Sequence, residues 1–203
     1  MAKNLPIIAY YIVFGAYGFW LPNDPRGSWS KYVWSKRLRP FGPATKNPDR
    51  YPDPQAEHDT PNRQVAKAAL KYPPVVFSGE QALAVAMGFR SIISKTGMVV
   101  YAAAIMPDHV HVVVAQQRMF AETIGGYLKR AASRELRKAG LHPLKAYPLK
   151  GGRLPTPWEE EGWKVFLHTD EEVHAAIEYV DDNPPNAGLR PQNWSFVTPF
   201  DPA

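Results

Sequence analysis

The chain has 203 residues, 45% of them hydrophobic, and a net charge of +5 at pH 7. This length and apolar content suffice for one buried core, so we expect a single domain over residues 1–203. The sequence has no cysteine and no apolar run of about eighteen residues, which excludes disulfides, thiolate metal sites and a membrane-spanning helix.

The first part of the chain predicts one strand followed by a long connection. The apolar, β-rich run 7–15 is typical of a core strand. Pro, Asn, Asp and Gly at 20–27 indicate a turn. Residues 28–76 are rich in Pro and charged residues and only weakly periodic. We therefore expect a long loop or insertion there, with a short helix at 62–70.

The middle of the chain predicts two helices and a hairpin. Apolar spacing indicates helices at 79–95 and 121–139. Between them, apolar runs at 98–105 and 109–115 read as strands, and the turn 106–108 joins them. So short a turn implies an antiparallel pair.

The last part predicts a strand and a final helix. Residues 163–167 form a short apolar run, and 169–172 fit a capping box that starts a helix near Asp170. Because Pro184 and Pro185 cannot continue a helix, we expect it to end near Asn183. The order of elements indicates an α+β fold: a ferredoxin-like β-α-β-β-α-β antiparallel sheet with helices on one face and an additional C-terminal helix.

The sharpest chemical feature is the run His109-Val110-His111. Residues i and i+2 of a strand point to the same face, so both imidazoles project together while Val110 points to the other face. Two convergent imidazoles are a natural pair of metal ligands, although two ordinary half-buried histidines fit the same pattern.

The final helix carries a second set of polar residues. Tyr179 and Asn183 are four residues apart and share a helical face, and Asp182 lies near that face. A phenol and an amide there can reach one metal-centred site. A core tyrosine and a helix-ending asparagine are the alternative.

These segments together resemble a known family. Ile105-Met-Pro-Asp-His-Val-His111 is similar to the Met-Pro-Asn-His-Val-His segment of the REP-associated tyrosine transposases, which are single-tyrosine HUH proteins of the IS200-like group. Residues 178–189 resemble their Tyr-Ile-x-x-Asn-Pro-Val-x-Ala-Gly segment, and Trp194-Ser195 matches a pair that follows it. Residues 17–27 resemble the Tyr-Gly-x-Trp-Leu-Pro-x-Asp-x-Arg-Gly turn of many members.

The resemblance covers residues 7–27 and about 79–198, but not 28–76. Asp108 stands where the family usually has Asn, and Pro185 stands where it usually has Val. Neither change removes a functional side chain.

The resemblance implies an HUH endonuclease fold, a function and its residues. His109 and His111 match the metal-binding pair, Tyr179 the nucleophile, and Asn183 the residue that completes the site for Mg²⁺ or Mn²⁺. The expected activity is cleavage and strand transfer on single-stranded or hairpin DNA through a 5′-phosphotyrosine, by a cytoplasmic, nucleoid-associated monomer or homodimer without a membrane partner.

Charge supports a nucleic-acid partner. Residues 118–153 contain nine Lys or Arg and two acidic residues. In the predicted helix 121–139, Arg130, Arg134 and Arg137 form one stripe. With Lys129 they are candidates for phosphate contacts, and a solvated face is the plain alternative. Trp20 and Trp29 are candidates for stacking on bases, although packing is the commoner role of Trp.

Three other functions remain open at this point. In a metal-dependent phosphodiesterase that uses water, Tyr179 only packs. In a non-catalytic protein that binds hairpin DNA, neither metal nor covalent adduct is needed. A relaxase or replication initiator shares HUH chemistry, but such proteins usually carry further domains.

Overall fold

The computed structural model describes residues 6–21, 38–41, 60–160 and 162–202. Most of the predicted insertion 28–76, including Trp29, lies outside the described residues. Two short elements of that region are described: the 3-10 helix η1 (Arg39–Phe41) and helix α1 (Thr60–Ala68), which is close to the short helix expected at 62–70.

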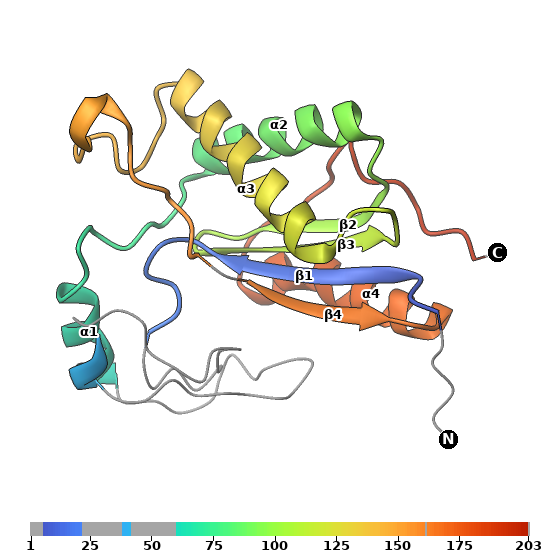
Figure 1. Cartoon of the computed structure of the whole chain (residues 1–203). Helices are drawn as coiled ribbons and strands as arrows, with labels where there is room; N and C mark the ends of the chain where they lie inside the picture. Colours follow the sequence, from blue (N-terminus) through green and yellow to red (C-terminus); the bar gives the residue numbers. More distant parts are fainter. Residues whose placement is uncertain (1–5, 22–37, 42–59, 161, 203) are drawn as a thin grey trace.

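Four strands form one antiparallel sheet in the order β2-β3-β1-β4 (Figure 1). They are β1 (Ala9–Gly15), β2 (Val100–Ile105), β3 (His109–Ala115) and β4 (Trp163–Leu167). The order along the chain and the order in the sheet are those of a ferredoxin-like unit. The predicted α+β fold class and the predicted antiparallel hairpin of β2 and β3 are therefore confirmed.

Helices cover both faces of the sheet, not one as expected. Helices α2 (Gly79–Thr96) and α3 (Ala121–Lys138) pack on one face, and α4 (Asp170–Asn186) packs on the other (Figure 1). The second layer is needed because every residue of the central strand β1 is buried. A strand that is apolar on both faces needs cover on both.

Each face has its own hydrophobic core. On the α2–α3 side, Phe14 of β1 contacts Phe89 and Trp158 edge to face, with ring centroids 6.2 and 5.4 Å apart. On the α4 side, Val173 and Val180 are completely buried against the sheet. The second core is what fixes α4, and with it Tyr179, under the strands.

Helix α4 runs beyond the predicted end at Asn183, through Pro184 and Pro185 to Asn186. Each proline removes one helical hydrogen bond and crowds the carbonyl four residues earlier, so the last turn of α4 forms at a local cost. The helix ends instead where Gly188 takes a left-handed conformation (φ 72°). There the amide of Leu189 donates to the Pro184 carbonyl at 2.8 Å. Asn183 therefore lies within the helix and is not its end.

The start of α4 follows the capping box in part. The Thr169 hydroxyl accepts a hydrogen bond from the Glu172 amide at 3.2 Å, as predicted. Glu172 reaches back one residue further than the motif requires and accepts from the His168 amide at 2.7 Å. Both bonds satisfy backbone donors around the first turn.

The free edge of β2 is covered by the chain that follows α4. The Gln192 side chain accepts from the Ile105 amide at 2.8 Å and donates to the Ile105 carbonyl at 2.9 Å. Further along, Val100 bridges to Val197. The side-chain amide thus takes the place of a neighbouring strand at an edge that would otherwise pair with other chains. Within the described ranges, no helix combines the length and the apolar character needed to cross a bilayer.

Helices α2 and α3 approach each other most closely at Gly88. A Cβ at this position would lie 2.7 Å from the Cα of Ala132 and 2.8 Å from the carbonyl oxygen of Ala131. Both contacts are with backbone atoms, which cannot rotate away as a side chain can. The close crossing therefore requires glycine.

We expect Gly88→Ala to lower the free energy of unfolding by about 1–3 kcal/mol, because the added methyl group forces the helices apart. Urea denaturation measures this difference. The matched control is Gly79→Ala at the start of α2, where a Cβ meets nothing within 4 Å and stability should stay the same or rise slightly. A Gly88→Ala protein as stable as Gly79→Ala would contradict the assigned close approach.

Candidate active site

His109 and His111 lie at the start of β3, on the face covered by α4. Their ring centroids are 4.6 Å apart and the rings are nearly perpendicular, at 84°. Val110 between them is completely buried in the core on the α2–α3 side. The predicted same-face placement of the two imidazoles is confirmed.

His111 is buried and is held from one side. Its Nδ1 lies 2.7 Å from the hydroxyl oxygen of Tyr11, and only 5% of the residue is exposed. Its Nε2 is buried and finds no hydrogen-bond partner among the residues that the structure describes. Burial holds the pKa of His111 well below its usual range, and the neighbouring His109 lowers it further. At neutral pH the ring is therefore uncharged and keeps a lone pair for an electrophile.

His109 is oriented by two neighbours. Its Nδ1 lies 2.7 Å from Oδ1 of Asp108, and its ring stacks on that of Phe19 with centroids 4.7 Å apart at 25°. A carboxylate on Nδ1 directs Nε2 towards the site, as carboxylate–histidine pairs do around metals. Asp108, which replaces the Asn usual in the resembling family, thus supplies a charged partner for the ring.

Tyr179 reaches this pair of histidines from α4 of the same chain. Its ring centroid lies 5.7 Å from that of His111 and 6.1 Å from that of Tyr11. Tyr179 and Asn183 are both half-buried, and Asn183 follows one helical turn later, whereas Asp182 is exposed. The structure therefore brings together His109, His111 and Tyr179, with Asn183 on the adjacent turn of the helix.

The donor set restricts what a metal ion would find here. In the described part of the chain, no three His, Asp or Glu side chains converge. Among these described residues, a third protein ligand beside the two imidazoles would be an amide, a hydroxyl or a backbone oxygen. Asn183 supplies an amide oxygen. The unpartnered Nε2 of His111 is the observation that fits a ligand to this site.

A family model described as "Transposase IS200 like" matches residues 68–183, more than half of the chain. The chain belongs to the IS200-like transposase family. The matched segment includes both histidines and Tyr179, and ends at Asn183.

Two solved structures resemble this transposase at low sequence identity. One, a REP-associated tyrosine transposase bound to a REP hairpin, has a TM-score of 0.47 and 9% identity over 97% of this chain and 79% of that one. The other, a putative transposase from Deinococcus radiodurans, has a TM-score of 0.45 and 12% identity over 90% of this chain and 95% of that one. No curated protein matches the sequence.

A half-buried carboxylate that the sequence does not reveal anchors the edge of the candidate site. Glu159 accepts hydrogen bonds from the backbone amides of the turn 18–20, with Gly18 N to Oε1 at 2.8 Å. Burial raises the pKa of Glu159 to about 7, against the opposing effect of these bonds and of Lys129. The turn so held contains Phe19, the residue that stacks on His109.

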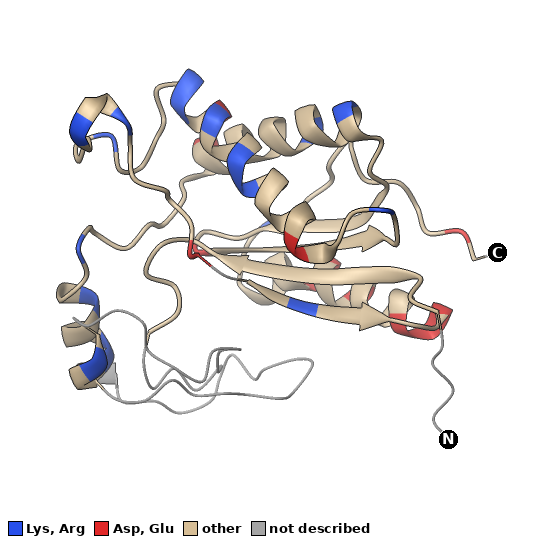
Figure 2. Cartoon of the chain, in the orientation of Figure 1, with Lys and Arg blue, Asp and Glu red and all other residues tan. Residues whose placement is uncertain are grey.

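The basic residues of α3 divide into two groups. Lys129 points to the end of the sheet and donates to the carbonyl oxygens of Glu159 and Glu160, each at 2.9 Å, so its ammonium group has a role in the fold. Arg130, Arg134 and Arg137 are exposed along α3 (Figure 2). The predicted stripe of three arginines is on the surface, while the structure gives Lys129 a different set of partners.

Glu159 predicts a pH dependence of stability. Between about pH 4.5 and 7 the unfolded chain releases this proton while the folded protein keeps it, so the free energy of unfolding falls as pH rises through this window. Relative to Glu159→Gln, the wild type should lose at most about 3 kcal/mol between pH 4.5 and 8. Chemical denaturation of both proteins across this range measures the difference.

Glu160→Gln, which removes an exposed carboxylate from the next position, controls for the loss of one charge. If the stability gap between wild type and Glu159→Gln stays constant from pH 4.5 to 8, the half-buried carboxyl does not titrate as assigned.

Proposed function

We propose that this transposase cleaves single-stranded DNA beside a hairpin and rejoins it to another strand, through a 5′-phosphotyrosine on Tyr179. The observation that carries the proposal is the contact of Tyr179 with His111 inside one chain of a transposase family. The hairpin substrate follows from the resemblance of residues 105–111 and 178–189 to the REP-associated tyrosine transposases.

His109 and His111 would bind a divalent ion through their Nε2 atoms, and Asn183 through its amide oxygen. When bound, Mg²⁺ or Mn²⁺ would polarise the scissile phosphate and offset the charge that develops on it. Imidazole ligands alone favour Mn²⁺ over Mg²⁺. Tyr11 and Asp108 each occupy the Nδ1 side of one ring, which leaves the Nε2 atom of each ring for the ion.

The covalent step conserves the phosphodiester energy. The Tyr179 oxygen loses its proton to solvent and attacks phosphorus, and the bond from phosphorus to the 3′ oxygen breaks. That oxygen takes up a proton and leaves as a free 3′-hydroxyl. A second 3′-hydroxyl then attacks the phosphotyrosine and restores the phenol. Tyrosine suits the reverse step because a phenoxide is a better leaving group than an alkoxide.

Tyr11 and Tyr179 both contact His111, but only one is accessible to DNA. Tyr11 is 3% exposed and its hydroxyl is bonded to the histidine. Tyr179 is half-buried on the surface helix. We therefore assign attack to Tyr179 and the orientation of the ring to Tyr11. The contact of Tyr179 with His111 within one chain supports a site that a single protomer completes by itself.

We expect Tyr179→Phe to abolish the covalent adduct while leaving DNA binding intact, because the ring still packs and only the attacking oxygen is lost. Labelled single strands from the flanks of the protein's own gene, incubated with Mn²⁺ and run on a denaturing gel, reveal the adduct. Cleavage that survives in Tyr179→Phe would show a hydrolase that uses water. Wild type without any adduct or metal dependence would show a protein that only binds DNA.

The same assay tests whether the site is completed within one chain. Tyr179→Phe and His109→Ala proteins, each inactive alone, should stay inactive when mixed. Restored adduct formation in the mixture would show that the tyrosine serves the histidines of a partner.

Tyr11→Phe should act on metal affinity and not on attack. Losing the hydroxyl that orients His111 should raise the Mn²⁺ concentration needed for half-maximal adduct by about 10–100-fold, with adduct still formed at saturating metal. A Mn²⁺ titration of the adduct yield measures this. An unchanged metal requirement would remove Tyr11 from its orienting role.

A further inference from the structure

Two segments far apart in the sequence carry cations and no carboxylates of their own. Residues 60–79 contain three Lys or Arg, residues 136–158 contain five, and neither segment contains Asp or Glu. Both lie at the same end of the molecule, around α1 and the 3-10 helix η2 (Lys150–Gly152) (Figures 1 and 2). A local excess of cations attracts a polyanion.

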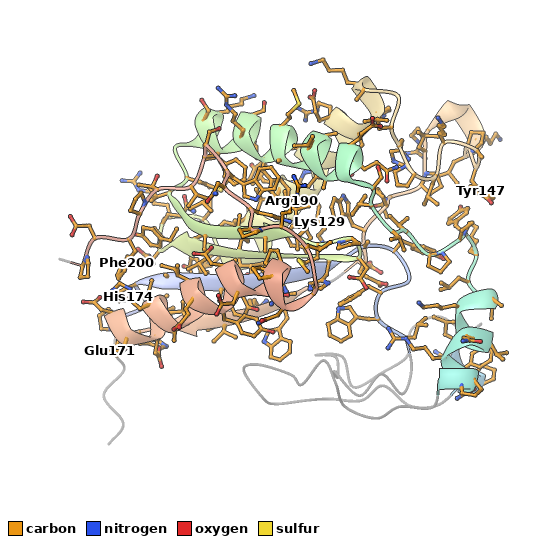
Figure 3. The ribbon with its side chains drawn as sticks, turned by 180° about the vertical axis from the view of Figure 1, so that it is seen from behind. Lys129, Tyr147, Glu171, His174, Arg190 and Phe200 are labelled. Carbon is orange, nitrogen blue, oxygen red and sulfur yellow. The ribbon has the colours of Figure 1, made fainter. Side chains whose placement is uncertain are left out.

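Tyrosines join the two segments. The ring of Tyr147 lies against that of Tyr72, with centroids 5.8 Å apart at 61°, and Tyr72 lies 5.8 Å from Tyr17 at 58°. Lys71 places its Nζ 5.2 Å from the centre of the Tyr72 ring, and its amide donates to the Tyr17 hydroxyl at 3.2 Å. The two inner rings are half-buried and fixed, while Tyr147 is 41% exposed at the outer edge (Figure 3).

The row of tyrosines leads towards the candidate active site. Tyr17 begins the turn whose backbone amides Glu159 binds, and Phe19 of this turn stacks on His109. The Tyr17 amide also donates to the Pro157 carbonyl at 2.9 Å, which ties the turn to the connection between α3 and β4 that carries Tyr147. A continuous series of packed residues therefore connects Tyr147, and any ligand bound there, to the two histidines.

Three features of the surface around Tyr147 determine which class of ligand it fits. An exposed aromatic ring that is supported from behind by other rings, with Lys71 beside the second ring, offers a stacking face together with charge. Unpaired bases stack on such faces, and phosphates pair with the cations around them. A duplex hides its base faces, and an acidic peptide has no planar group to use the ring.

We propose that Tyr72, Tyr147, Lys71 and Lys150 form a site, here named the tyrosine platform, for an unpaired nucleotide of the DNA strand. A base stacks on Tyr147, and the flanking phosphates pair with the lysines. Nothing in the chemistry at Tyr179 requires this site. The inference rests on the proposed function, because it places the single-stranded part of the same DNA.

The test measures the affinity of full-length Tyr147→Leu and Tyr147→Phe for two probes by fluorescence anisotropy. One probe is a blunt DNA hairpin, and the other is the same hairpin with an oligothymidine flank. Tyr147→Leu should weaken binding of the flanked probe by about five- to 100-fold and leave the blunt hairpin unchanged, since one stacked base is lost. Tyr147→Phe keeps a ring and should bind as the wild type does.

The matched control is Phe166→Ala on β4, which removes an aromatic side chain of nearly the same exposure, 42%, from a strand far from the platform. It should not change affinity for either probe. Wild-type affinity of Tyr147→Leu for the flanked probe would overturn the proposal, and so would an equal loss on both probes. Far-ultraviolet circular dichroism confirms that each variant is folded.

Photo-cross-linking tests the contact directly. With 5-iododeoxyuridine in the flank, irradiation should attach the strand to Tyr147 or Tyr72, as mass spectrometry of the digested complex reads out. Attachment only elsewhere would overturn the platform. Because binding and cross-linking need no covalent step at Tyr179, a platform that passes both tests without any phosphotyrosine adduct would leave this inference standing and end the proposed function.

Discussion

The pairing register of β1 with β3 is the constraint on which the site depends. It places Gly15 opposite His109 and Val13 opposite His111, so Tyr11 lies diagonally across from His111 and within hydrogen-bond distance of it. A slip of one residue would turn both imidazoles into the core on the α2–α3 side. The same register lets the turn after β1 fold back over His109. Apolar packing on both faces of the sheet therefore fixes the polar geometry at its end.

The second core sets the position of the phenol. Val173 and Val180 are buried against the sheet from the same helix that carries Tyr179, so the ring is held by packing on either side of it along α4. The helix continues past Pro184, and Asn183 consequently stays in regular helical geometry one turn from Tyr179. Had α4 ended at Asn183, its side chain would have no fixed direction relative to the tyrosine.

The local parts of this architecture could be predicted from the sequence, and the non-local parts could not. Alternation along a strand suffices for the facing of His109 and His111, and apolar spacing suffices for α2 and α3. The partner of His111, Tyr11, depends on a register between strands about a hundred residues apart. Glu159 and Lys129 resemble ordinary surface charges until the fold closes around them. Only the structure shows that Lys129 binds backbone carbonyls, which distinguishes it from the three exposed arginines.

The distribution of charge indicates how a strand reaches Tyr179. The outer surface of α4 exposes Glu178, Asp181 and Asp182, and burial together with Asp182 raises the pKa of Asp181. These carboxylates repel phosphates along the helix that bears the nucleophile. Exposed cations are prominent on α3 and on the segments around η2, away from α4 (Figure 2). If the proposed function is right, this distribution favours a DNA strand that follows the basic surface and rounds the end of the sheet at the 17–20 turn, because the acidic face of α4 repels phosphates.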